Sequence, residues 1–169
     1  MAPVHPVGMP HPIRWNLEPT LDSLDAFLPF AHSALHHPSE RRRADAILLR
    51  WATAWQGPER VLEFTRSHHG AYLHLNQLVG TTWCKVCTFH AAPRHGLSMR
   101  GPDPDRMRKS HKLRRNKLDR EPLDKVFDAW SAHPEARPAG NAVELYLEEV
   151  PDEVWEACLV AALEALGKG

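Results

Sequence analysis

The chain has 169 residues, of which 43% are hydrophobic and 25% are charged, a length and composition typical of one globular domain. Its 21 basic and 21 acidic residues give a formal net charge of zero, which excludes a uniformly basic, histone-like protein and an acidic disordered chain.

Two helices are expected near the start of the chain. Residues 1–18 hold four of the prolines and are predicted to form a flexible arm, followed by a single domain over residues 19–169. The first helix should follow Thr20, with Pro29 kinking or splitting it. The second should be capped by Ser39. Its predicted apolar face comprises Ala44, Ile47, Leu48, Trp51, Ala54 and Trp55, and the opposite face comprises Arg42, Arg43 and Arg50.

The middle of the chain is predicted to form a small antiparallel sheet. Residues 71–75 alternate in polarity, and residues 81–89 are rich in β-branched and aromatic side chains. Residues 90–96 are expected to connect them to a short strand at 97–100. Residues 61–67 suit either a short helix or a strand, so their pattern leaves both open.

The last third returns to helices. A polar basic helix is expected over residues 106–118, followed by a helix that begins near Asp119. The apolar face of that second helix comprises Leu123, Val126, Phe127 and Trp130. A loop at residues 133–140, a strand at 143–147 and a helix after Pro151 complete the chain. This order predicts an α+β fold: N-terminal helices, a small antiparallel sheet, a polar basic helix, and a C-terminal helix–strand–helix unit packed on the sheet.

The strand, the Pro-Asp-Glu turn and the helix between Val143 and Leu166 are similar to the end of YjbR-like small bacterial domains. The resemblance covers this segment alone, and it implies nothing about function.

The charges are distributed unevenly along the chain. Residues 1–100 hold 10 basic and 7 acidic residues, residues 101–120 hold 8 and 3, and residues 121–169 hold 3 and 11. The net charges of the three parts are therefore +3, +5 and −8. Asymmetry of this kind indicates either a surface that binds polyanions or a pairing of opposite charges within the chain.

The basic segment, residues 106–120, is the clearest candidate for a binding site. In a helix, Arg108, Lys112 and Arg115 share one face, where their like charges repel each other. A nucleic acid would relieve this repulsion and release counterions. The predicted nucleic-acid-binding residues are Arg106, Arg108, Lys109, Lys112, Arg114, Arg115, Asn116 and Lys117. The alternative is a solvated helix neutralised by the acidic C-terminal third.

Cysteines and histidines suggest a second chemistry. Cys84, Cys87, His90 and His95 lie within twelve residues and are ligand types that zinc uses. In a strand, however, Cys84 and Cys87 would point to opposite faces, which favours two cysteines packed in a sheet. Tyr72 and Trp83 are further candidates, because an exposed aromatic ring on a sheet can stack on unpaired bases.

We therefore expect a non-enzymatic protein that binds nucleic acid, with DNA favoured, and that needs no cofactor. The alternatives are a protein-interaction or regulatory module, acting through the basic helix or the acidic C-terminal region and including a homodimer, and a small metal-dependent nuclease using His68, His69, His90 or Asp105. Three cysteines and no apolar run of membrane-spanning length favour a cytoplasmic protein. Fifteen arginines against six lysines favour a bacterial source.

Overall fold

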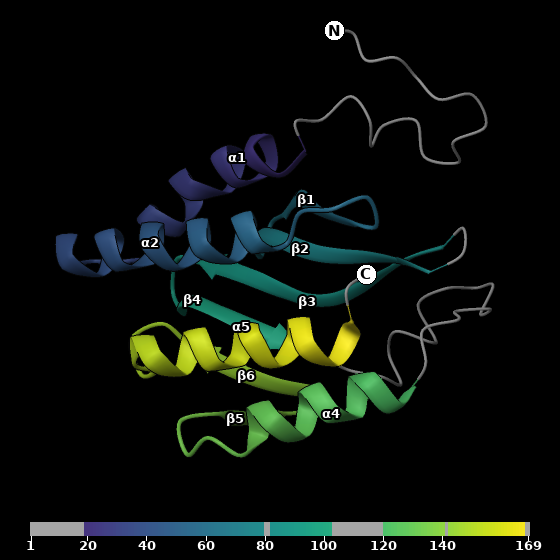
Figure 1. Cartoon of the computed structure of the whole chain (residues 1–169). Coiled ribbons are helices and arrows are strands. Elements are labelled where there is room, and N and C mark those ends of the chain that lie inside the picture. Colours follow the sequence, from purple (N-terminus) through teal and green to yellow (C-terminus); the bar gives the residue numbers. More distant parts are fainter. Residues whose placement is uncertain (1–18, 80–81, 103–119, 141, 168–169) are drawn as a thin grey trace, which may run out of the picture.

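Every strand of the structure belongs to one antiparallel sheet (Figure 1). This computed structural model describes residues 19–79, 82–102, 120–140 and 142–167. The strand order across the sheet is β1-β2-β3-β4-β6-β5. The strands are β1 (Arg60–Ser67), β2 (Gly70–Val79), β3 (Thr82–Ala92), β4 (Gly96–Gly101), β5 (Arg137–Ala139) and β6 (Ala142–Tyr146).

The helices of the described residues lie together on one face of this sheet (Figure 1). They are α1 (Pro19–Ser33), α2 (Pro38–Ala54), α4 (Arg120–Ser131) and α5 (Asp152–Leu166). The core forms between these helices and the covered face of the sheet. The α+β class is therefore confirmed. The arm at residues 1–18 and the basic helix at 106–118 lie outside the described residues.

Prolines set the local structure of the first two helices in ways that differ from the prediction. Pro29 does not split α1, which continues past it to Ser33. The second helix begins earlier than a Ser39 cap would allow: His37 is the N-cap, and Pro38 takes the first helical turn. Proline suits that place, since its missing N–H would have no partner there and its φ is already helical.

Three segments form strands where the prediction was a loop or was left open, and each does so by pairing with another strand. The ambiguous residues 61–67 form strand β1, in which Leu62 is buried against the core. His90 and the two alanines after it continue β3 instead of starting a connection, because they pair with β4. Residues 137–139 form the short strand β5 within the predicted loop. Each of these segments is extended because it pairs with the next or the preceding strand, and the propensity of the segment alone does not show that pairing.

A β-bulge interrupts the pairing between β2 and β3. Leu75 lies opposite Cys87 while Asn76 lies opposite Lys85, which leaves Val86 as an extra residue in β3. Val86 and Cys87 are consecutive and both buried, whereas regular alternation would expose one of them. The bulge therefore turns an additional apolar side chain into the core.

Four aromatic side chains join the helices to the sheet. Trp51 of α2 contacts Phe89 of β3 at a ring-centroid distance of 5.3 Å, Trp155 of α5 at 6.0 Å and Trp130 of α4 at 6.1 Å. All three contacts are edge-to-face, the arrangement that aromatic quadrupoles favour. The indole of Trp130 also donates a hydrogen bond to the Cys158 carbonyl at 2.8 Å. The predicted core positions of these tryptophans are confirmed.

Removing the central ring should destabilise the whole fold. We expect Trp51→Ala to lower the free energy of unfolding by about 3–5 kcal/mol, because it leaves a cavity between α2, α4, α5 and β3. Leu49→Ala is the matched control on the same helix, since the Leu49 side chain is 51% exposed, and it should cost under about 1 kcal/mol. Urea unfolding monitored by far-UV circular dichroism measures both. Equal losses would contradict this role of Trp51.

Candidate functional site

The residues predicted to bind nucleic acid cannot be placed in the fold. Arg106, Arg108, Lys109, Lys112, Arg114, Arg115, Asn116 and Lys117 all lie outside the described residues. The described chain resumes at Arg120, which begins α4. What the structure does define is the environment of the acidic C-terminal third, the alternative partner of the basic segment.

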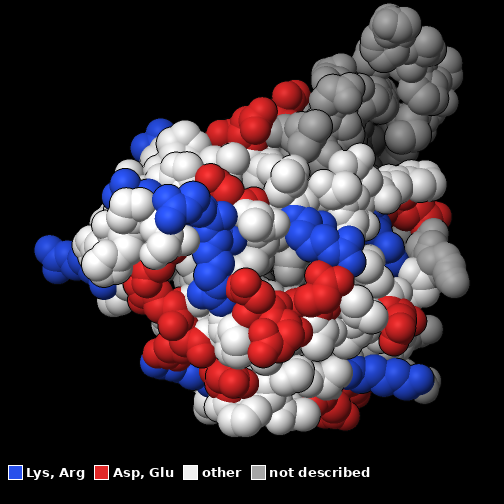
Figure 2. All heavy atoms as spheres, turned by 60° about the vertical axis from the view of Figure 1, so that its left-hand side comes forward, with Lys and Arg blue, Asp and Glu red and all other residues white. Residues whose placement is uncertain are grey.

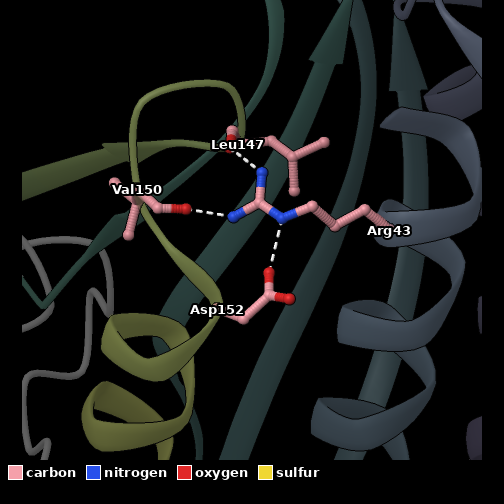
Figure 3. A network of polar contacts seen from close by, with 4 residues as sticks. All are labelled: Arg43, Leu147, Val150 and Asp152. Carbon is pink, nitrogen blue, oxygen red and sulfur yellow. Dashed lines mark hydrogen bonds and ion pairs between the residues drawn. The ribbon is translucent and has the colours of Figure 1, made fainter. Parts of the chain in front are cut away.

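One arginine of α2 holds the start of α5 (Figure 3). Arg43 donates hydrogen bonds from Nε to the Asp152 carboxylate at 2.5 Å and from Nη1 to the Leu147 carbonyl at 2.6 Å. Its Nη2 donates to the Val150 carbonyl. Figure 3 shows all three oxygens converging on a single guanidinium. Arg43 is therefore a structural clamp between α2 and the loop that follows β6.

A second arginine of α2 continues this contact along α5. Arg50 forms a two-pronged ion pair with Glu156, with Nε–Oε1 at 2.9 Å and Nη2–Oε2 at 2.6 Å. The hydrogen bond to Arg50 lowers the pKa of Glu156, and the same bond raises the pKa of Arg50. Both side chains are about half exposed, so the pair sets the orientation of the helices more than their stability.

Two further acidic residues of the C-terminal third have arginine partners on the sheet. Glu149 pairs with Arg137, whose Nε donates to Oε1 at 2.9 Å and whose guanidinium lies 4.6 Å from the centre of the Tyr146 ring. Glu144 is largely buried; it accepts a hydrogen bond from the Ser98 hydroxyl at 3.0 Å and lies 3.6 Å from Arg100.

Acidic and basic side chains are consequently interspersed on the side of the molecule that Figure 2 shows. Asp152, Glu156, Glu149 and Glu144 each pair with an arginine that lies outside the basic segment. Three of these arginines, Arg43, Arg50 and Arg100, come from the first hundred residues, and the first two join α2 to α5. The acidic third is thus neutralised in part by charges that the sequence placed elsewhere.

The face of the sheet that the helices leave uncovered carries a polar cluster on β1, β2 and β3. His74 of β2 is buried between its neighbouring strands: Nε2 lies 2.8 Å from the Thr65 hydroxyl of β1, and Nδ1 lies 2.9 Å from the Thr88 hydroxyl of β3. Burial, reinforced by the charge of Lys85, lowers the pKa of His74 from 6.5 to about 4. The imidazole is therefore neutral at pH 7, and it links three strands.

Tyr72 lies in the same cluster, where its ring is already stacked. The His90 ring, directly across on β3, lies parallel to it at 4.6 Å, and the His74 ring lies at 5.9 Å. One face of the Tyr72 ring is therefore covered by His90, and stacking of a base on Tyr72 stays a prediction; the side chain of Trp83, the other candidate, is not among those that the structure describes. Gly70 completes the packing, because a Cβ at Gly70 would come within 2.9 Å of His90 Nε2.

Two of the four residues considered as zinc ligands, Cys87 and His90, point to opposite faces of the sheet, and the side chain of Cys84 is not among those that the structure describes. The Cys87 side chain is buried in the core opposite Leu75, whereas His90 faces the polar side opposite Tyr72. Burial raises the pKa of the Cys87 thiol, and it raises the pKa of the buried Cys158 thiol to about 12. Within the described residues, no group of three or more His, Cys, Asp or Glu side chains is arranged to hold a metal ion. The interpretation of Cys87 and Cys158 as core cysteines is confirmed.

Sequence reasoning missed both polar arrangements that organise the described residues. The Arg43 clamp had no local signal, because its acceptors lie more than a hundred residues away. The alternation of Tyr72 and His74 with buried residues did signal a polar sheet face, but the hydroxyl partners of His74 come from two other strands.

No helix among the described residues is long and apolar enough to span a membrane. Comparison of the chain with protein-family models, with curated proteins and with solved structures gave no match. Function is therefore inferred from the residues of this chain and their contacts.

Loss of the Arg43 clamp should destabilise the junction of α2 and α5. Arg43→Ala leaves the Leu147 and Val150 carbonyls without their donor, and we expect the free energy of unfolding to fall by about 2 kcal/mol. Arg42→Ala removes an exposed neighbour of the same charge and should change it by under about 0.5 kcal/mol. Chemical denaturation of the two variants tests this, and the clamp is unimportant if they are equally stable.

The buried imidazole predicts a loss of stability in acid. The folded state binds fewer protons than the unfolded state between the folded pKa of about 4 and the unfolded value near 6.5. The contribution of His74 is therefore complete above pH 6.5 and lost as the pH falls toward 4, by about 2–3 kcal/mol between pH 7.5 and 4.5.

His74→Gln should flatten this part of the profile, whereas the exposed His95→Gln should retain it. Urea unfolding at four pH values between 7.5 and 4.5 measures the effect. An unchanged profile in His74→Gln would assign the acid sensitivity to other groups.

Proposed function

We propose that this protein binds nucleic acid, with DNA favoured, through the basic segment at residues 106–120 and without catalysing a reaction. Eight basic side chains and one acidic side chain lie in this segment. The observation that carries the proposal is that four acidic residues of the C-terminal third pair with Arg43, Arg50, Arg100 and Arg137. Four of the eleven acidic residues in this third of the chain are thus engaged by arginines outside the basic segment.

A phosphate backbone is the partner that suits such a segment. Dense positive charge on a short stretch of chain gains most from a ligand that carries regularly spaced negative charge, because each contact releases a condensed counterion. Phosphate contacts of this kind are independent of sequence, and Asn116 and Arg114 add side chains that can read base edges. Affinity that falls steeply with salt is the signature of this mode of binding.

The two alternatives have less in their favour. A protein-interaction module that uses the acidic region would have to compete with the arginines already bound to Asp152 and Glu156. For a metal-dependent nuclease, the candidates His68, His69 and His90 join no metal-holding group among the described residues, and Asp105 lies outside them.

Charge reversal tests the proposal. We expect the triple variant Arg108→Glu, Lys112→Glu and Arg115→Glu to weaken binding to duplex DNA by about a hundredfold or more at 100 mM salt. The slope of log K against log salt should fall by about 3, one unit per lost phosphate contact. Fluorescence anisotropy with single- and double-stranded DNA and RNA, each at several salt concentrations, measures affinity and slope together.

The control is a variant with the same change in net charge at residues outside the segment. Arg42, Lys85 and Arg94 are exposed on α2, on β3 and in the turn after β3, and replacing all three by Glu should reduce affinity far less. If both triple variants lose affinity equally, binding follows net charge and not the basic segment. If neither loses affinity, the segment is not the binding site.

A further inference from the structure

The two edges of the sheet differ in how far they are protected against pairing with another strand. β5, at one edge, has three residues, and its Pro138 has no N–H to donate. Short length and proline are common protections of an edge strand. β1, at the other edge, has eight residues and no proline. The free side of β1 is therefore the edge at which backbone groups could accept another strand.

Three hydrogen bonds show which residues of β1 face that free side. The Leu78 N–H donates to the Glu59 carbonyl at 2.7 Å, so the backbone N–H and carbonyl groups of the odd-numbered residues point toward β2. The backbone groups of the even-numbered residues point away from β2. The Arg60 N–H donates to the Gly57 carbonyl at 3.3 Å, and the Leu62 carbonyl accepts from the Ser23 hydroxyl at 3.3 Å. This alternation is the one that an antiparallel ladder requires.

The protection of β1 ends after Leu62. Gly57 and Ser23 occupy groups at Arg60 and Leu62, but no described residue pairs with the backbone N–H or carbonyl of Phe64 or Arg66. Beside them lies a small aromatic surface. The Phe30 ring of α1 lies 5.8 Å from the Phe64 ring, and the Arg66 guanidinium lies 4.7 Å from the centre of the Phe30 ring. An added strand would meet both backbone groups and this surface.

We propose that a second copy of this chain pairs with β1 at this edge, antiparallel and related by a twofold axis at Thr65. Phe64 of each copy then lies opposite Arg66 of the other, and the two hydrogen-bonded pairs supply four backbone hydrogen bonds. Each arginine faces a phenylalanine, as Arg66 already faces Phe30 within the chain. On the other face of the sheet Thr65 meets Thr65, a favourable cross-strand pair.

The charge of the chain is compatible with self-pairing. A net charge of zero gives two copies no long-range repulsion. Four hydrogen bonds and a small side-chain contact make a limited interface, which predicts a reversible dimer that depends on concentration and not an obligate one. The proposal is independent of nucleic-acid binding, because it uses the edge of β1 and no residue of the basic segment.

Light scattering coupled to gel filtration, with the full chain loaded between about 5 and 500 µM, tests the proposal. The wild type should shift from monomer toward dimer as concentration rises. Arg66→Pro removes the N–H that faces the free edge and should raise the dimer dissociation constant by about tenfold or more. Arg66→Ala keeps that N–H and should have a smaller effect. Circular dichroism verifies that each variant is folded.

Cysteine cross-linking tests the register without depending on Arg66→Pro. In the proposed pairing two Thr65 residues form a non-hydrogen-bonded pair, whose Cα atoms lie about 4.5 Å apart, so Thr65→Cys should form a disulfide-linked dimer under mild oxidation. Ser67→Cys is the control, since the two copies of that residue would lie about 13 Å apart. Wild type treated in the same way accounts for the natural cysteines.

Three results would overturn the proposal. The first is a wild type that stays monomeric throughout the concentration series. The second is a dimer that Arg66→Pro leaves unchanged, which would place the interface elsewhere. The third is equal cross-linking of Thr65→Cys and Ser67→Cys, or none of either, which would exclude this register.

Discussion

The packing of Trp51 is the contact on which the other arrangements depend. Its ring touches β3, α4 and α5 at once, through Phe89, Trp130 and Trp155. Because those contacts fix α2 against α5, two arginines of α2 come within reach of acidic residues on α5. The apolar core thus determines which charges meet on the surface.

The pairing of α2 arginines with α5 acids shows which basic residues balance part of the acidic charge in a chain whose net charge is zero. Along the sequence, a strongly acidic third follows a strongly basic segment, and mutual neutralisation of the two neighbours is the simplest expectation. In the fold, Asp152 and Glu156 pair instead with Arg43 and Arg50 from the first hundred residues. Part of the acidic charge is thus engaged by arginines outside the segment at 106–120, and this supports the proposal of a polyanion as the partner of that segment.

Local patterns predicted the fold where burial is repeated regularly along one element. The apolar stripes of α2, α4 and α5 identified Trp51, Trp130 and Trp155 as core residues, and alternation identified β6 around Val143 and Leu145. The failures have a common cause, which is that pairing with a neighbouring strand overrides the preference of the segment itself. Residues 61–67 became a strand through β2, and residues 137–139 became one through β6.

The candidate site was less predictable than the fold, for electrostatic and geometric reasons. A run of basic residues is visible in a sequence, but its partner is not, because ion pairs depend on which surfaces the core brings together. The clamp of Arg43 on Leu147 and Val150 shows this, since it spans more than a hundred residues. Likewise the sequence shows His74 only as a polar residue within a predicted strand. In the fold it links three strands through hydrogen bonds with Thr65 and Thr88.

A heteronuclear NMR titration with a short DNA duplex tests the central claim most directly, because it reports on the basic segment and on the paired arginines in the same sample. The account predicts shifts concentrated at residues 106–120, while the Nε–Hε signals of Arg43 and Arg50 stay unchanged because these side chains remain bound to Asp152 and Glu156. Shifts at Arg43 and Arg50 with none at 106–120 would contradict it, and would mean that the duplex displaces the acidic residues of α5 from their arginines.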